Sequence, residues 1–170
     1  MFKYKKVVVI GCSGAGKSTF SRKLAKVTHL PLVYLDMLYW NADCTHITRA
    51  EFLDKQKKIL LSDSWILDGN FRNTLEYRIR EADMIFFFDL PTDVCINGVL
   101  TRGKREDMPC DLPADDELIE YIKNYDTDCK PKIYKLLKKY SGKKVITFYS
   151  HSDADNYIES LLKEENEQWI

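Results

Sequence analysis

The sequence has no excess of charge, because 26 lysines and arginines balance 26 aspartates and glutamates over 170 residues. A zero formal charge gives no general attraction to nucleic acid or to an anionic membrane, so direct DNA binding is not expected. No apolar run approaches the roughly 18 residues that a membrane helix needs. Residues 1–6 lead into a short apolar run without a signal-peptide core. These absences favour a cytoplasmic protein that holds any anion at a local site.

Cysteine is scarce and irregularly spaced. The sequence has five cysteines, an odd number, and no C-x-x-C pair; they are Cys12, Cys44, Cys95, Cys110 and Cys129. This pattern argues against a disulfide framework and against a cysteine zinc site, so we expect reduced, mostly packed thiols. The three histidines, His29, His46 and His151, are too scattered to suggest a metal site.

Short apolar runs alternate with helical patterns along the chain. The expected strands are residues 7–10, 32–35, 65–67, 84–88 and 145–149. Helical patterns follow at 18–27, after a Thr48-x-x-Glu51 capping box, near 75–82, and at 91–100, 115–125 and 133–140; Ser152-x-x-Asp155 is expected to cap the last helix. Five strands separated by helices predict an α/β domain spanning residues 1–170, with a parallel sheet covered on both faces.

One motif carries a specific chemistry. Residues 11–18 read G-C-S-G-A-G-K-S, which fits G-x-x-x-x-G-K-[ST] between an expected strand and an expected helix. Glycines let successive N–H groups point at an anion, and the helix start adds its positive dipole end. Lysine then reaches the β/γ-phosphates and the serine hydroxyl ligates Mg²⁺. The predicted phosphate-binding loop comprises Gly11, Cys12, Ser13, Gly14, Ala15, Gly16, Lys17, Ser18 and Thr19; the alternative is a glycine-rich turn with an exposed lysine.

The segment after the third strand narrows the class of nucleotide-binding protein. A GTPase would carry N-K-x-D, whereas residues 123–126 read K-N-Y-D. Residues 68–72 read D-G-N-F-R and resemble the D-G-F-P-R of the adenylate-kinase group, with Asn70-Phe71 in place of Phe-Pro. That resemblance implies a three-layer P-loop fold with strand order 2-3-1-4-5, ATP as the nucleotide, and Arg72 as a ligand of the acceptor's phosphate.

A second resemblance covers nearly the whole chain, to the bacterial topology modulation proteins, a branch of adenylate-kinase-like P-loop proteins. It rests on V-I-G-C-S-G-A-G-K-S-T, on Y-L-D-M-L-Y-W at 34–40, on W-I-L-D-G-N at 65–70, on L-x-x-R-x-x-x-A-D at 75–83, on R-G-K-R at 102–105 and on K-P-K at 130–132. The family name reports a link to DNA supercoiling, which keeps a nucleotide-dependent regulatory role open as an alternative.

Charged residues at strand ends complete the predicted site. Asp68 is favoured over Asp89 for holding an Mg²⁺-bound water, because the implied strand order puts the third strand beside the P-loop strand. Asp36 follows the second strand and is either a base for the acceptor hydroxyl or a turn residue. Arg102 and Arg105 begin a charged, proline-containing stretch without period, 102–113, which we interpret as a mobile lid that stabilises the transferred phosphoryl group; a solvated basic loop is the alternative.

These features predict an ATP-dependent kinase that uses Mg²⁺. Residues of about 40–62 would bind a nucleotide or another small-molecule acceptor, with Asp36, Arg49, Arg72 and Arg78 as candidate contacts; Arg78 has an ion pair on its own helix as an alternative. A slow ATPase, or a regulatory protein associated with DNA topology, is the competing function.

Overall fold

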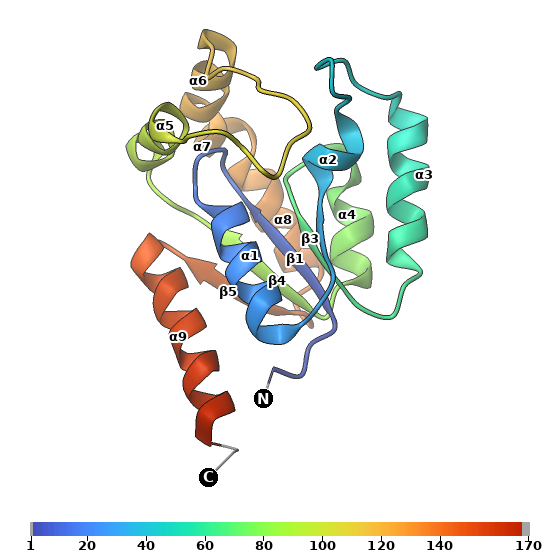
Figure 1. Cartoon of the computed structure of the whole chain (residues 1–170), viewed down its shortest axis with the longest axis vertical. Helices are drawn as coiled ribbons and strands as arrows, with labels where there is room; N and C mark the ends of the chain where they lie inside the picture. The colour runs from blue at the N-terminus through green and yellow to red at the C-terminus, as the bar shows by residue number, and fades with distance from the viewer. Residues whose placement is uncertain (1, 168–170) are drawn as a thin grey trace.

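A computed structural model describes residues 2–167, which form a three-layer α/β domain (Figure 1). Five parallel strands make one sheet in the order β2-β3-β1-β4-β5. The strands are β1 (Lys6–Gly11), β2 (Leu32–Tyr34), β3 (Trp65–Asp68), β4 (Met84–Phe88) and β5 (Lys144–Phe148). The fold class and the strand order predicted from the sequence are confirmed.

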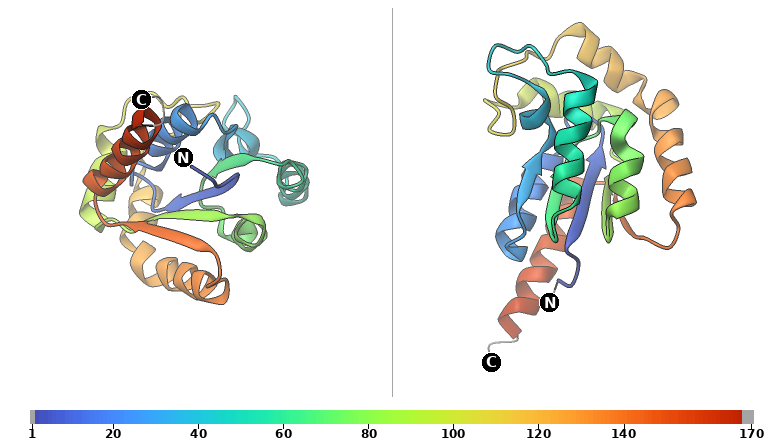
Figure 2. Two further views of the ribbon diagram at one scale, coloured as in Figure 1. Left: turned by 90° about the horizontal axis from the view of Figure 1, so that it is seen from below. Right: turned by 90° about the vertical axis from the view of Figure 1, so that its right-hand side faces the viewer.

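Helices cover both faces of the sheet, with α1 and α9 on one side and α4 and α8 on the other (Figure 2). The helices are α1 (Lys17–Thr28), α2 (Leu35–Tyr39), α3 (Arg49–Leu60), α4 (Arg72–Glu81), α5 (Thr92–Thr101), α6 (Asp116–Lys123), α7 (Tyr125–Asp128), α8 (Lys130–Lys139) and α9 (His151–Glu167). Within residues 2–167, none of these helices has the length and apolar character needed to cross a membrane.

The core forms where the central strands are buried on both faces. Every residue of β3 and β4 is buried, as expected for strands covered by helices on both sides. Phe20 of α1 packs edge-on against Phe86, Phe88 and Phe148, with ring centroids 4.8, 5.4 and 5.2 Å away. These contacts fix α1, and therefore the loop that precedes it, over the carboxyl ends of the strands.

Two helix starts test the sequence reasoning. The Thr48–Glu51 capping box is present: the Glu51 N–H donates to Thr48 Oγ1, and the Glu51 carboxylate accepts from the Thr48 N–H. The predicted cap of the last helix is wrong by two residues, because α9 begins at His151 and the Asp153 carboxylate accepts from the Ser150 N–H. Ser150-x-x-Asp153 and Ser152-x-x-Asp155 have the same spacing. Only Ser150-x-x-Asp153 lies next to the free backbone amides that follow β5.

Two further boundaries differ from the prediction. The helical pattern at 115–125 is split into α6 and α7, with Asn124 between them. Helix α8 begins at Lys130, ahead of the expected 133, and carries a proline in its first turn, where a missing N–H leaves no helical hydrogen bond broken.

The cysteine prediction is wrong for one pair. Cys44 and Cys110 form a disulfide between positions 66 residues apart in sequence, with their Cα atoms 5.5 Å apart. The other three, Cys12, Cys95 and Cys129, are free and buried as expected. The odd number and irregular spacing of the cysteines did not reveal this bond, because folding brings together two loops that lie far apart in the sequence.

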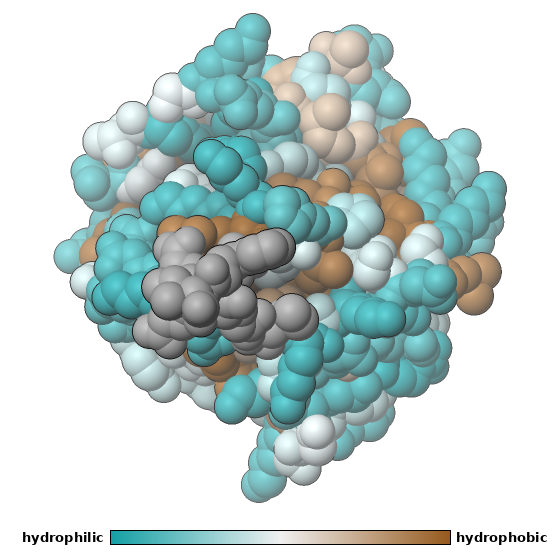
Figure 3. All heavy atoms as spheres, turned by 60° about the horizontal axis from the view of Figure 1, so that its bottom comes forward, coloured by the Kyte–Doolittle hydropathy of each residue, from teal (hydrophilic) through white to brown (hydrophobic). Residues whose placement is uncertain are grey.

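Hydrophilic side chains predominate at the end of the molecule where the parallel strands begin, with apolar ones visible between them (Figure 3). The opposite end, beyond the carboxyl ends of the strands, is where ligands bind in open α/β sheets. The candidate site lies there.

Candidate nucleotide-binding site

A cavity of about 590 Å³ opens beyond the carboxyl ends of β1, β2 and β3. Its walls are the 11–19 loop, the start of α2, the segment that follows β3, and the irregular stretch after α5. The predicted residues that line it are Ser13, Gly14, Gly16, Lys17, Ser18, Thr19, Asp36, Asp68, Arg102 and Arg105. The topology thus gathers four separate sequence motifs around one space.

The backbone of the 11–19 loop depends on glycine. Gly11, Gly14 and Gly16 have φ angles of 147°, 80° and 86°, which side-chain-bearing residues rarely adopt. A Cβ atom on Gly14 would also collide with the Cys95 carbonyl oxygen of α5. Helix α1 begins directly after Gly16 without a side-chain cap in the described chain, so its first N–H groups remain open to an anion.

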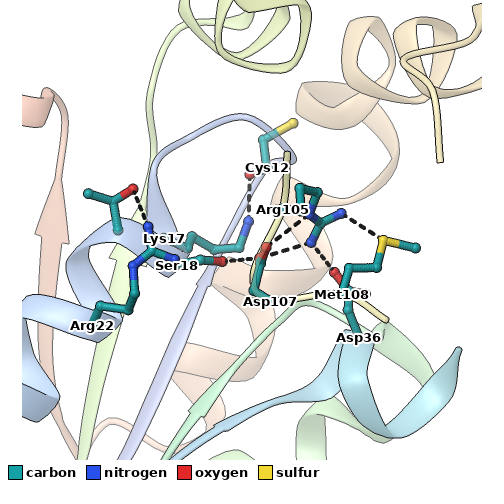
Figure 4. Close-up of polar contacts among 9 residues, drawn as sticks. Cys12, Lys17, Ser18, Arg22, Asp36, Arg105, Asp107 and Met108 are labelled. Carbon is teal, nitrogen blue, oxygen red and sulfur yellow. Dashed lines mark hydrogen bonds and ion pairs between the residues drawn. The ribbon is translucent and has the colours of Figure 1, made fainter. Parts of the chain in front are cut away.

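Lys17 and Ser18 project from the start of α1 into the cavity (Figure 4). Lys17 Nζ donates a 2.7 Å hydrogen bond to the carbonyl oxygen of Cys12, which holds the ammonium across the loop. The Ser18 hydroxyl donates a 2.6 Å hydrogen bond to the Asp107 carboxylate. An ammonium and a hydroxyl on one turn are the two side chains that a phosphate-binding loop needs.

Asp68 ends β3 beside these two side chains. It is only 3% exposed, and its Oδ1 has no hydrogen-bond partner among the described residues. Burial raises the pKa of this carboxyl to about 6, and the Lys17 charge and the Ser18 hydroxyl oppose that rise. A buried, under-satisfied carboxylate next to a serine hydroxyl fits a hard divalent cation such as Mg²⁺.

The stretch after α5 is anchored by Arg105. Its guanidinium donates to Asp36 at 2.6 Å and to the two Asp107 oxygens at 3.0 and 2.9 Å. Burial acts to raise the pKa of Asp107, but hydrogen bonds from Arg105 and Ser18 outweigh it and lower that pKa to about 2. The stretch is therefore folded onto the cavity by a charged network that runs from α2 to the 11–19 loop.

Comparison with known proteins supports the same architecture. No protein-family model matches the chain. The adenylate kinase of Rickettsia akari (strain Hartford) is 31% identical over an alignment of 121 positions, and the match covers 56% of this chain and 57% of that protein. The chain therefore spans little more than half the length of this curated relative.

Solved structures match over almost the whole chain. The shikimate kinase of Acinetobacter baumannii, solved in complex with shikimate, is 11% identical with a TM-score of 0.60 and covers 94% of both chains. The chain therefore shares the fold of this shikimate kinase. The shikimate kinase of Bacteroides thetaiotaomicron is 16% identical with a TM-score of 0.55, and the match covers 96% of this chain and 99% of that kinase. A sugar kinase of Janibacter is 17% identical with a TM-score of 0.53, and the match covers 95% of this chain and 94% of that kinase.

Within this fold, three predicted acceptor residues lie away from the cavity. Arg49 is exposed at the start of α3, and Arg72 is exposed and donates to the Asp128 carbonyl oxygen at 3.2 Å. Arg78 is fully buried, and its guanidinium donates to the carbonyl oxygens of Gly69, Asn70 and Phe71. Among the described residues, Arg78 neither lines the cavity nor forms an ion pair on its helix. Its guanidinium holds the backbone segment that follows β3.

Asp89 is engaged elsewhere. Its carboxylate pairs with Lys130 at 2.6 Å and accepts a 2.6 Å hydrogen bond from the Tyr134 hydroxyl. These contacts join the end of β4 to α8. Asp68, in contrast, lines the cavity, and the assignment of the metal to Asp68 stays a prediction.

Sequence reasoning missed two polar contacts of the candidate site. The Asn70 side chain accepts a 3.0 Å hydrogen bond from the Gly11 N–H and so fixes the start of the phosphate loop. Asp107 was not singled out within the charged stretch, although it contacts both Ser18 and Arg105. Asn70 had a signal, because it departs from the Phe-Pro of D-G-F-P-R; Asp107 had none, since a carboxylate in an irregular loop reads as solvated surface.

Proposed function

We propose that the protein is an ATP-dependent small-molecule kinase that uses Mg²⁺. The observation that carries the proposal is one continuous cavity, which joins Lys17 and Ser18 on one wall to Asp36, Arg102 and Arg105 on the other. Residues 11–19 would bind the triphosphate through backbone N–H groups, with Lys17 on the β/γ-phosphates. Ser18 and Asp68 would hold Mg²⁺, which neutralises charge on the phosphate oxygens.

The other wall supplies the groups that transfer requires. Asp36 would accept the proton of the acceptor hydroxyl as that oxygen forms its bond to the γ-phosphorus and the bond to the β-phosphate oxygen breaks. Arg102 and Arg105 would stabilise the negative charge on the migrating phosphoryl group. Asp36 and Arg105 can take these roles only after Arg105 exchanges its present carboxylate partners for phosphate oxygens. The network at Asp36 and Asp107 therefore belongs to the state without nucleotide.

The acceptor we favour is a small hydroxyl compound rather than a nucleoside monophosphate. Arg72, the residue that matches the phosphate-gripping arginine of the D-G-F-P-R sequence, is exposed on α4 and bonded to a backbone carbonyl. Two proteins of the same fold are a shikimate kinase, solved in complex with shikimate, and a sugar kinase. Shikimate and sugars are hydroxyl compounds that carry no phosphate. The resemblance to topology modulation proteins remains a prediction about family membership.

The test is a screen of purified protein with ATP·Mg²⁺ against hydroxy acids, sugars, nucleosides and nucleoside monophosphates, with ADP release as the readout. The proposal expects ADP release that depends on one class of acceptor, and a loss of about 100-fold or more in Lys17→Met. Equal, slow ADP release with every compound would favour a slow ATPase or a regulatory protein. Acceptor-dependent turnover that persists in Lys17→Met would remove the phosphate role of that lysine.

A further inference from the structure

A covalent bond beside the cavity joins the lid loop, which lines the cavity, to the turn that follows α2. Cys110 lies in the lid loop, residues 102–113, and Cys44 lies in the turn between α2 and α3; the two form a disulfide. We propose that this pair is a thiol–disulfide exchange site whose oxidation straps the lid loop closed over the cavity. In Figure 2 the turn and the lid loop lie side by side at the end of the molecule that holds the cavity.

The turn presents Cys44 to the lid loop in a fixed position. The Asn41 N–H donates to the Thr45 carbonyl oxygen at 2.8 Å, and the Cys44 N–H donates to the Asn41 carbonyl oxygen at 3.0 Å. Trp40 and His46 pair across the base of this turn as an antiparallel bridge. Cys44 is partly exposed, so its sulfur can be reached by a dissolved thiol, whereas Cys110 is only 9% exposed.

The strap acts on the residues that close the cavity. Asp107 and Met108, just before Cys110, are 7% and 6% exposed, so this part of the lid loop is packed against the rest of the domain. Asp107 accepts from the Ser18 hydroxyl, and Arg105 pairs with Asp36. A bound nucleotide can replace such polar contacts with phosphate contacts, but it cannot break a covalent bond. The disulfide therefore sets whether the lid loop can leave the cavity at all.

The remaining cysteines do not compete for this chemistry. Cys12, Cys95 and Cys129 are 3%, 0% and 1% exposed. A hydrogen bond between Cys12 and Cys95 raises the pKa of Cys12 and lowers that of Cys95, but Cys95 is fully buried, so a dissolved disulfide does not reach it. In the described part of the chain, exchange is thus directed to the bond between Cys44 and Cys110.

A dithiol reductant can reduce the Cys44–Cys110 disulfide while it is itself oxidised to a disulfide. A thiolate of the reductant attacks the more exposed sulfur, that of Cys44, and the Cys110 sulfur leaves as a thiolate that takes up a proton. The second reductant thiol then releases Cys44, which leaves two protein thiols and one oxidised reductant. A low-molecular-weight disulfide reverses the reaction.

The first test reads lid opening without any nucleotide. The tryptic sites after Arg102, Lys104 and Arg105 lie in the lid loop between α5 and the disulfide. Trypsin should cut them faster once the lid loop leaves the domain, because cleavage requires a mobile, accessible segment. We expect cleavage there to accelerate about tenfold or more when dithiothreitol reduces the wild-type protein. Cys44→Ser should be cut at the fast rate with or without dithiothreitol, and Cys129→Ser, away from the lid, should keep the wild-type response.

Two results would overturn the strap. One is a lid cleavage rate that is the same in oxidised and reduced wild-type protein. The other is a titration of the denatured, air-oxidised protein that finds five free thiols instead of three. Mass spectrometry of the unreduced tryptic peptides checks the pairing directly, since a peptide with Cys44 must be joined to one with Cys110.

The second test rests on the proposed function. The association rate of a fluorescent ATP analogue with Mg²⁺ should rise about tenfold on reduction of the wild-type protein, and should be insensitive to dithiothreitol in Cys44→Ser. Equal association rates in both redox states would overturn the gating role. Absence of nucleotide binding in both states, with lid cleavage still dependent on dithiothreitol, would overturn the proposed function and leave the strap intact.

Discussion

The Ser18 hydroxyl donates its hydrogen bond to Asp107, 89 residues away, at 2.6 Å. Ser18 is the residue that the phosphate-loop pattern assigns to the metal, so the lid loop places a carboxylate where the hydroxyl would otherwise meet Mg²⁺ and phosphate. The same carboxylate holds Arg105 with two hydrogen bonds. In this state the lid loop occupies the site with its own anion.

Replacement of Asp107 should strengthen nucleotide binding. Asp107→Asn removes the negative charge that competes for Ser18 and frees Arg105, so the affinity for ATP·Mg²⁺ should increase about three- to tenfold. Calorimetry in dithiothreitol measures this with the disulfide reduced. The matched control is Asp111→Asn, an exposed carboxylate of the same loop, which should leave the affinity unchanged. A weaker affinity in Asp107→Asn would mean that the carboxylate helps to hold the metal.

The sequence predicted the parts of this site that depend on local pattern. The phosphate loop was readable because glycines, a lysine and a serine stand at fixed spacing between a strand and a helix. Asp36 and Asp68 were readable because parallel strands end at one edge of a sheet. Asp107 and the Cys44–Cys110 bond were not, since both depend on how an irregular loop folds back across the domain. Arg78 was misplaced because a helical position does not show whether its face is buried.

Arg78 should matter for stability rather than for acceptor binding. Its buried guanidinium satisfies the carbonyl oxygens of Gly69, Asn70 and Phe71, and a lysine cannot reach all three. We expect Arg78→Lys to lower the free energy of unfolding by about 2–4 kcal/mol in urea denaturation. Arg80→Lys, on the exposed side of the same helix, should change it by less than about 0.5 kcal/mol. An unchanged urea midpoint in Arg78→Lys would contradict this role.

Gly14 should tolerate no side chain. Its φ of 80° is strained for alanine, and a Cβ atom would collide with the Cys95 carbonyl oxygen, so Gly14→Ala must move the phosphate loop or α5. The expected result is a loss of ATP·Mg²⁺ affinity of about tenfold or more, together with destabilisation of about 1–3 kcal/mol. Gly103→Ala is the matched control, because a Cβ atom there meets nothing within 4 Å. Equal behaviour of the two variants in binding and melting would rule out the steric argument.

The last prediction concerns pH. The pKa of Asp68 is raised from 3.8 to about 6 by burial, so the folded protein holds a proton that the unfolded chain has already released between these values. Stability without metal must therefore fall as pH rises from 4 to about 6, by about 2 kcal/mol for this group. Asp68→Asn lacks this ionisation. Between pH 4 and pH 7 its free energy of unfolding should therefore rise relative to that of the wild type by about the same amount.

Urea denaturation in a metal chelator across this pH range measures the difference directly. Asp155→Asn, an exposed carboxylate paired with Lys23, should give a curve parallel to the wild type. If the Asp68→Asn curve were also parallel, the carboxyl would not be buried as described. Mg²⁺ should reverse the comparison at pH 7, because the cation binds only the ionised carboxylate and stabilises the wild-type protein by mass action, while Asp68→Asn gains much less.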